Sequence, residues 1–264
     1  MLDDVDIPLA CSLMHAPSLV GWAGDLPHHE IDRFLREVAR FLSEKEQPAL
    51  PLTQGPKAGE TRTNPADGLT YVWIPPGTFT MGCSTGDTEC RDNEKPPRMM
   101  KIANGFWLGQ TLVTQAAWKK VMKGNNPSEF KGDRLPVEKV SWDEANEYCR
   151  AIGGRLPSEE EWEYASRAGV TDARYGHIDA IAWHKRNSGG TTHPVGLKQA
   201  NGWGLYDTMG NVWEWTGSAY DDNTKVLRGG SWYDDTKVAG VSGRYGDEPA
   251  DRDDSIGFRC VWMP

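Results

Sequence analysis

The chain has 264 residues, a formal net charge of -9, 12 tryptophans and 29 glycines. This length allows one domain of about 100–200 residues and a shorter appendage. A nucleic-acid partner would favour a clustered face of lysines and arginines, so this acidic chain predicts no nucleic-acid partner. No run of about 18 uncharged apolar residues is present, and the first residues lack the pattern of a secretory signal. We therefore expect no membrane contact and a cytoplasmic location.

Residues 1–43 differ in pattern from the rest of the chain. A short strand is expected at Val5–Leu9, and a helix is expected to begin near Asp25. Its apolar residues recur at helical spacing, at Ile31, Phe34, Leu35, Val38, Phe41 and Leu42. The runs Leu2–Leu9 and Gly21–Asp25 resemble the last strand, loop and final helix of a bacterial TIR domain. The catalytic glutamate region of that domain has no counterpart here, so NAD cleavage is not implied. Alternatively, the helix packs on the main domain, because about 40 residues rarely hold a core alone.

Residues 44–68 are rich in Glu, Pro, Gly, Lys and Thr and lack periodicity, as expected of a linker. The main domain is therefore expected to span residues 69–264. Its first strands are predicted at Leu69–Ile74 and Thr78–Met81, and the turn Pro75-Pro76-Gly77 between them indicates a hairpin.

Two helices of this domain are predicted by capping boxes, in which a serine and a glutamate three residues later bond each other's backbone amides. These pairs are Ser141 with Glu144 and Ser158 with Glu161. Glycines at 153 and 169 are expected to end the two helices. A weaker helix is expected after Thr114.

The five cysteines are an odd number spread thinly over the chain, so we expect most of them to be reduced. They are Cys11, Cys83, Cys90, Cys149 and Cys260. Cys83 and Cys90 lie in one loop and could pair or bind a metal, although no CxxC or nearby histidine completes a zinc set. The many tryptophans and glycines favour a compact fold with much irregular loop.

Several blocks of sequence carry a family signature. In chain order they are Ile74–Gly82, Leu135–Val137, Val140–Trp142, Gly154–Glu163, Asn201–Asp207, Gly210–Trp215, Arg228–Trp232 and Ile256–Arg259. This ordered set resembles the formylglycine-generating-enzyme family, also called the sulfatase-modifying factor family. The resemblance implies an α+β, C-type-lectin-like fold with a twisted antiparallel sheet, two main helices and much irregular loop. The fold hosts enzymes and ligand-binding proteins, so it does not by itself define a function.

The positions that bind copper in the enzymes of this family are changed here. In those enzymes, two cysteines lie three and eight residues after the serine of the Arg-Gly-Gly-Ser block. Counted in the same way from Ser231, these positions hold Asp234 and Ala239 in this chain. Neither side chain supplies the soft thiolate that suits Cu(I), so no catalytic residue and no copper are expected. Cys260 lies in the context of the final strand, where a buried structural role is expected.

The resemblance also implies a structural calcium ion beside the Gly-Asn-Val-Trp-Glu-Trp block. Its ligands would be the side chains of Asp207 and Glu214 and the carbonyls of Gly210 and Val212. Carboxylates and backbone carbonyls form the hard oxygen set that Ca²⁺ prefers. Alternatively, Glu214 only accepts hydrogen bonds from amides of the loop.

Between Trp232 and Arg259, framework residues alternate with clusters that have no packing periodicity. This stretch resembles the variable region of a diversity-generating retroelement target protein, in which mutation of template adenines turns asparagine codons into codons for Tyr, Asp, Val, Gly or Ser. The residues expected to vary and to bind ligand are Tyr233, Asp234, Asp235, Val238, Gly240, Val241, Gly243, Tyr245, Gly246, Asp247, Asp253, Asp254 and Ser255. No asparagine follows Asn223. Alternatively, this is an acidic loop without a binding role, because loops contain the same residue types.

The sequence therefore predicts a non-enzymatic protein that binds a protein or a small ligand on a hypervariable C-terminal surface. Tyr233 and Tyr245 would be its anchors, because tyrosine gives a large amphipathic contact area at low entropic cost. The aspartates would favour a basic patch on the partner. The alternatives are an oxidoreductase of the same family with an altered active site and the sensor part of a TIR-type effector.

Overall fold

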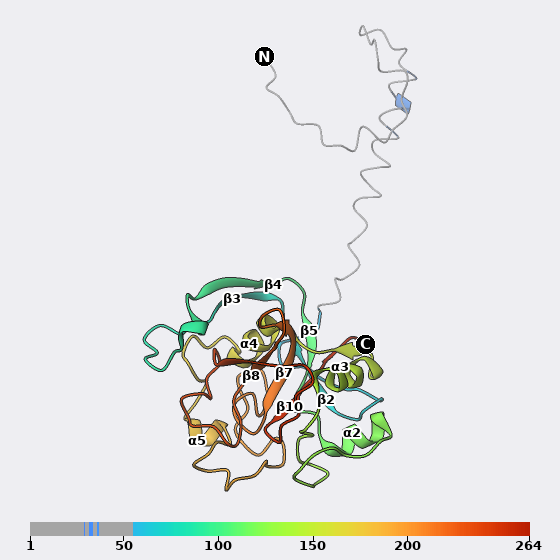
Figure 1. The fold of residues 1–264 in the computed structure, drawn as a ribbon. Coiled ribbons are helices and arrows are strands. Elements are labelled where there is room, and N and C mark those ends of the chain that lie inside the picture. Colours follow the sequence, from blue (N-terminus) through green and yellow to red (C-terminus); the bar gives the residue numbers. More distant parts are fainter. Residues whose placement is uncertain (1–28, 30–31, 34–35, 37–54) are drawn as a thin grey trace. The chain divides into compact units, whose positions relative to one another are not determined.

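The computed structural model describes residues 29, 32, 33, 36 and 55–264 (Figure 1). The chain divides into two compact units, Met1–Gln54 and Gly55–Pro264, and each is treated by itself. The four described residues of the first unit are helical and exposed, in agreement with the helix predicted there. The predicted strand Val5–Leu9 and the apolar residues of that helix lie outside the described residues.

The second unit contains a five-stranded antiparallel sheet. Its strands, in spatial order, are β1 (Thr61–Thr63), β2 (Thr70–Ile74), β5 (Phe106–Gly109), β11 (Val261–Trp262) and β6 (Gly154–Arg155). The C-terminal strand β11 lies between β5 and β6, with Val261 opposite both Leu108 and Arg155. β1 lies in the stretch predicted as a linker and pairs with β2, so this unit of structure begins before residue 69.

Two smaller sheets complete the unit. The four-stranded sheet has the order β10 (Ile256–Phe258), β7 (Trp213–Ala219), β8 (Lys225–Arg228) and β9 (Arg244–Asp247), and only its β10–β7 pair is parallel. The two-stranded sheet pairs β3 (Gly77–Met81) with β4 (Arg98–Ile102). The hairpin predicted between β2 and β3 is wrong, since β2 pairs with β1 and β5. The Pro75-Pro76 turn instead carries the chain from one sheet to another, because proline donates no hydrogen bond to a ladder.

Four α-helices flank the sheets in this described unit. They are α2 (Gln115–Met122), α3 (Trp142–Ala151), α4 (Glu159–Arg167) and the single-turn α5 (Ile178–Ile181), and a 3-10 helix, η3, covers Asp92–Glu94. Both capping boxes are confirmed: Ser141 and Ser158 accept from the amides of Glu144 and Glu161, whose carboxylates accept from the serine amides. None of the described helices is both long and apolar enough to span a bilayer.

The largest apolar cluster joins the five-stranded sheet, α2, α3 and the four-stranded sheet. Within it, Trp118 of α2 stacks on Tyr148 of α3 at a centroid distance of 5.8 Å, and Phe258 of β10 meets both rings edge-on. Trp215 Nε1 donates to the Val140 carbonyl oxygen at 3.0 Å, so this fully buried indole has a partner. These ring contacts therefore join α2, α3 and β10 within one apolar core.

Two disulfide bonds correct the expectation that most cysteines are reduced. Cys83 bonds Cys90, which resolves the alternatives left open for this pair, and Cys149 bonds Cys260. Cys149 and Cys260 are buried in the largest apolar cluster, which confirms the structural role expected for Cys260. Counting cysteines missed the Cys149–Cys260 pair because packing brings these two residues together over a separation of 111 residues.

Candidate ligand-binding surface and metal site

The loop after β8 carries most of the predicted binding surface, and its first residues are tightly held. Arg228 is buried and pairs with Glu159 and Glu163 of α4. Gly229 and Gly230 follow with φ values of +96° and +76°, a region that favours glycine. The buried ion pairs and these two glycines fix the direction in which the loop leaves the sheet.

Asp234 and Ala239, which the family resemblance matches to the copper-binding cysteines, have structural contacts here. Asp234 Oδ2 accepts hydrogen bonds from Ser231 Oγ at 2.6 Å and from the Ser231 amide at 3.0 Å. Ala239 is buried in a small apolar cluster. Within the part of the chain that the structure describes, no group of three His, Cys, Asp or Glu side chains is placed to hold a metal ion. A copper site built on Asp234 and Ala239 therefore has no support in the side-chain chemistry.

The residues predicted to bind ligand differ in their exposure. Tyr233 and Tyr245 are 62% and 52% exposed, so both rings are open to a ligand. The other exposed or half-buried positions are Asp234, Asp235, Val238, Gly240, Gly246, Asp247, Asp253, Asp254 and Ser255. Val241 and Gly243 are buried and do not belong to the exposed surface.

Val241 and Gly243 have clear structural constraints. Val241 packs in an apolar cluster with Ile181 and Met209. A Cβ at Gly243 would lie 2.5 Å from the Val238 carbonyl oxygen, so a larger residue there requires a backbone shift. Both positions were predicted to vary from their residue types alone, and the residue types reachable from an asparagine codon carry no information about burial.

Aromatic contacts join the two exposed tyrosines into one surface. Tyr245 lies 6.2 Å from Trp213 between ring centroids, and the Trp213 amide donates to the Ser255 carbonyl oxygen. At the other end, Trp232 Nε1 donates to the carbonyl oxygen of Asp254, and the Trp232 and Tyr233 rings meet edge-on at 5.6 Å. The predicted positions at 233, 245 and 253–255 are thus linked through two tryptophans of the family blocks.

Three further residues border this surface and were not found by sequence reasoning. The Phe130 ring meets Trp232 edge-on at 5.4 Å, and Lys185 Nζ lies 5.2 Å from the centre of the Tyr233 ring. Arg186 Nε lies 4.0 Å from Asp235 Oδ1. They come from loops far from the C-terminus in the sequence, and nothing in their local pattern marked them.

The carboxylates of this surface differ in their surroundings: Arg186 lies near Asp235, whereas Asp247 and Asp254 have raised pKa values. Burial, together with the hydrogen bond and the charge of Asp251, raises the pKa of Asp247 to about 6. Burial and the charge of Asp253 raise the pKa of Asp254. A positively charged group of a ligand would stabilise these carboxylates in their ionised form.

The predicted calcium position centres on Asp207, which is buried and has a left-handed backbone with φ of +53°. Its Oδ2 accepts from the Gly196 amide at 2.7 Å, whereas its Oδ1 is buried without a partner. Burial raises the pKa of Asp207 to about 6, although the Gly196 amide and Arg259 lower it. A buried carboxylate oxygen without a partner is unfavourable, and a hard cation would satisfy it.

Glu214, the other predicted carboxylate ligand, already has a cationic partner. Arg259 Nε and an Nη atom donate to its two oxygens at 2.7 and 2.8 Å, and both residues are buried. The same guanidinium donates to the Asp207 carbonyl oxygen at 3.1 Å. Arg259 therefore neutralises the charge of Glu214. The Asp207 carboxylate remains as the negative charge that a cation would balance. The residues thus fit a calcium ion with Asp207 as its main ligand.

Antiparallel sheets, two capped helices and long irregular loops define a C-type-lectin-like domain. The chain belongs to the formylglycine-generating-enzyme family: residues 57–264 match the family model described as the sulfatase-modifying factor enzyme 1-like domain. The family and the fold predicted from the sequence are thereby confirmed.

Two relatives and one solved structure illustrate the range of this family. The chain is 38% identical to an inactive C-alpha-formylglycine-generating enzyme 2 of Bos taurus, over 64% of this chain and 62% of that protein, so it spans less than two thirds of the relative's length. It is 33% identical to a formylglycine-generating enzyme of Streptomyces coelicolor, over 81% of this chain and 94% of the enzyme. The solved structure of Treponema denticola variable protein 1 matches with a TM-score of 0.68 and 26% identity, over 78% of this chain and 99% of that one.

Proposed function

We propose that this protein is a non-enzymatic binding protein that presents a diversified C-terminal surface on the lectin-like scaffold. The observation that carries the proposal is the pair of exposed rings, Tyr233 and Tyr245, each of which contacts a tryptophan ring, Trp232 and Trp213 respectively. Exposed tyrosines on a rigid framework are characteristic of binding surfaces, because two side-chain torsions place a large contact area. Framework tryptophans would keep their positions while the neighbouring residues change.

The comparisons support this proposal in two respects. One relative carries the word inactive in its name, and the solved structure with 26% identity is named a variable protein. In this chain, Asp234 and Ala239 stand at the positions of the family's copper-binding cysteines, and Asp234 hydrogen-bonds within its own loop. A binding role therefore agrees with the side chains at the former active site better than oxidation chemistry does.

The partner that suits this surface is a protein or a small ligand with a basic patch. Asp235 and Asp253 are exposed, and the pKa values of Asp247 and Asp254 are raised first by burial and then by the neighbouring carboxylates of Asp251 and Asp253. Opposite charge on a partner would set the orientation and the rate of association. The tyrosine rings would supply the apolar contact at its centre.

The codons of this surface give the direct test of diversification. We expect sequencing of the last part of the gene in a growing population to show substitutions only at template adenines, confined to the exposed positions and absent from Val241 and Gly243. An invariant gene end without a template copy would contradict the proposal. In that case bound copper or iron, or oxidation of a thiol substrate with O₂, would establish the altered enzyme, and a TIR sequence upstream in the same gene would favour the sensor of an effector.

Replacing both anchors, as Tyr233→Ala and Tyr245→Ala, should abolish binding without unfolding the domain. Peptides selected from a random display library on the unaltered protein would serve as the probe, and at least tenfold weaker binding is expected, because each anchor commonly contributes about 2 kcal/mol. The Tm should change by less than about 3 °C, since the effect of exposed substitutions is usually within about 0.5 kcal/mol. Met99→Ala, at a residue that is 71% exposed in β4, is the matched control and should leave binding unchanged. A large fall in Tm for the tyrosine variants would instead place these rings in the core.

We also propose that a calcium ion stabilises the loop before β7, held by the Asp207 side chain with the carbonyls of Gly210 and Val212, while Glu214 stays paired with Arg259. At a calcium concentration about 100-fold above the dissociation constant, the folded state should gain about 2.7 kcal/mol, which corresponds to a Tm increase of roughly 5–10 °C. Thermal unfolding of chelator-treated protein, with and without added calcium, measures this gain.

Asp207→Asn is the control for the calcium site. It removes the charge that would bind the ion, so the calcium-dependent increase in Tm should disappear. Without calcium, the variant should be at least as stable as the unaltered protein, because it no longer buries an unbalanced carboxylate. Equal Tm values for the unaltered protein with and without calcium would show that no such site exists.

A further inference from the structure

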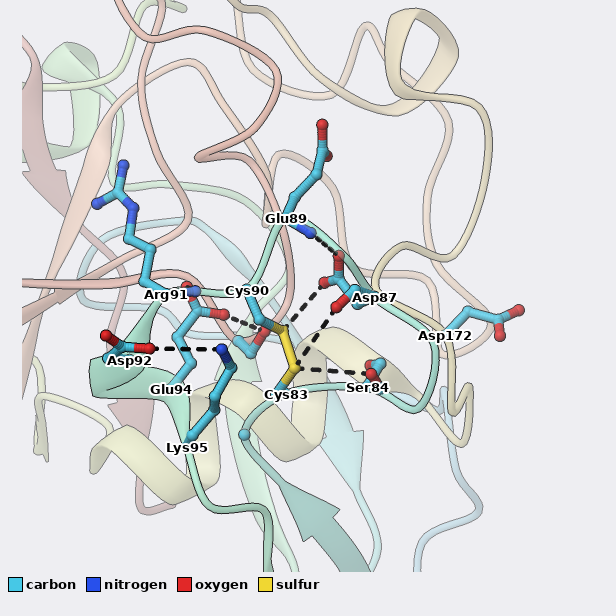
Figure 2. The surroundings of a disulfide bond; sticks show 12 residues. Cys83, Ser84, Asp87, Glu89, Cys90, Arg91, Asp92, Glu94, Lys95 and Asp172 are labelled. Carbon is cyan, nitrogen blue, oxygen red and sulfur yellow. Dashed lines mark hydrogen bonds and ion pairs between the residues drawn. A yellow bond between two sulfur atoms is a disulfide. The ribbon is translucent and has the colours of Figure 1, made fainter.

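The Cys83–Cys90 disulfide closes a short loop (Figure 2). Glu89 of this loop is linked through Arg174 to residues 236 and 239, which lie among the predicted binding residues in sequence. Both cysteines are half-buried, whereas Cys149 and Cys260 are only 0% and 1% exposed. A thiol reagent can therefore reach the first disulfide in the folded protein more readily than the second. The two bonds differ enough in access to be reduced one at a time.

An ion pair connects this disulfide loop to the loop of residues 236–242. Glu89, next to Cys90, accepts from Arg174 at 2.9 Å. The same guanidinium donates to the carbonyl oxygens of Thr236 at 2.7 Å and Ala239 at 2.9 Å. Arg174 thus holds two turns of the 236–242 loop while Glu89 holds Arg174.

Backbone contacts on the same side add to this arrangement. The carbonyl oxygen of Ala173 accepts from the Val241 amide at 3.0 Å, directly beside Arg174. Within and beside the 236–242 loop, Val238 donates to Asp235, Gly240 to Val238 and Gly243 to Gly240, and the buried Arg228 donates to the carbonyl oxygens of Val241 and Ser242. Arg174 thus contacts the part of the loop at residues 236–239, and Arg228 contacts residues 241 and 242.

The other end of the disulfide loop reaches the same region. The Cys83 amide donates to the Glu94 carbonyl oxygen at 3.0 Å, and Glu94 Oε2 accepts from Ser242 Oγ at 2.7 Å. Figure 2 shows Asp87 and Glu89 on one side of the disulfide and Glu94 on the other. Asp87 Oδ1 accepts from the Glu89 amide at 2.8 Å, which fixes the turn that presents Glu89. The closed ring thus positions both glutamates that contact the 236–242 region.

We propose that the Cys83–Cys90 bond determines how rigidly the 236–242 loop is held, so that its reduction loosens this part of the binding surface. The inference rests on the proposed binding function. In the reaction, a dithiol reductant gives two electrons and two protons, the bond between the two sulfur atoms breaks, Cys83 and Cys90 become thiols, and the reductant becomes a disulfide. Loss of the ring frees Glu89 from its fixed turn and weakens its hold on Arg174.

Hydrogen exchange, measured on the full chain, tests without a ligand whether the Cys83–Cys90 bond rigidifies the 236–242 loop. After mild treatment with dithiothreitol, with mass spectrometry confirming that Cys149–Cys260 is intact, the amides of Val238, Gly240 and Val241 should exchange roughly tenfold faster. The variant Cys83→Ser/Cys90→Ser should give the same increase. Amides of β7 and β8 serve as the internal reference and should keep their rates.

Glu89→Gln tests the Glu89–Arg174 ion pair independently of the disulfide. The variant keeps the Cys83–Cys90 bond and removes only the charge that holds Arg174. It should speed exchange at the same three amides by a similar factor, and reduction of this variant should add little more. Unchanged exchange in the reduced protein, or in Glu89→Gln, would overturn the proposal. The exchange measurement involves no ligand, so its failure would not contradict the proposed binding function. Likewise, failure of the tyrosine test would not change the exchange result.

Discussion

Arg259→Met should lower the free energy of unfolding by about 3–5 kcal/mol, which is the usual cost of leaving one member of a buried ion pair alone. Arg259 is 0% exposed and pairs with Glu214, which is 1% exposed. Its guanidinium also donates to four backbone carbonyl oxygens, those of Gly109, Gln110, Tyr206 and Asp207. The single side chain therefore ties β10 to β5 and to the loop before β7, and its loss leaves a buried charge and several acceptors unpaired.

Chemical denaturation measures the loss in the free energy of unfolding, and two further variants serve as comparisons. Arg98→Met removes an exposed arginine whose pair with Glu160 spans 3.5 Å, and it should cost less than about 1 kcal/mol. The double change Arg259→Met/Glu214→Leu should recover part of the loss, because no unpaired charge is left in the core. A cost for Arg259→Met as small as that of Arg98→Met would show that the buried pair does not support the fold.

Cys149→Ala/Cys260→Ala should lower the free energy of unfolding by about 4–5 kcal/mol, because the bond closes a loop with a sequence separation of 111 and so restricts the unfolded chain strongly. The bond also links α3 to the residue just before β11, inside the largest apolar cluster. Removing the shorter ring, as Cys83→Ser/Cys90→Ser, should cost only about 2–3 kcal/mol in the same chain-entropy model, since its separation is 7.

Guanidinium denaturation under non-oxidising and oxidising conditions tests this ranking. Reductant strong enough to open both bonds should bring the unaltered protein close to the variant without Cys149 and Cys260. An equal effect of the two double variants would contradict the loop-length argument and would show that packing around the cysteines dominates.

The parts of the fold that the sequence predicted correctly are those encoded over short distances. Ser141 with Glu144 and Ser158 with Glu161 lie within one helical turn of each other, so the helix starts could be read without tertiary information. The strand at Leu69–Ile74 was also found, but its partner was not. Strand pairing is decided by which segments pack together, and β2 pairs with β5, more than thirty residues away.

The candidate site shows the same division. Residue types identified Tyr233 and Tyr245, which are exposed, and the family resemblance identified Asp207, whose buried oxygen has no partner. Residue types did not distinguish the exposed tyrosines from the buried Val241 and Gly243, because residues that can arise by mutation of an asparagine codon occur at buried and exposed positions alike. Phe130, Lys185 and Arg174 contact the C-terminal loop from distant parts of the chain, and their neighbours in sequence carry no sign of it.

The sequence by itself determined the family and the capped helices, because motifs and side-chain chemistry are local properties. Only the tertiary structure decided which cysteines bond, which strands pair and which C-terminal residues face outward. These depend on the packing of segments that meet after folding, where burial and close contact select one arrangement among many that the local sequence permits.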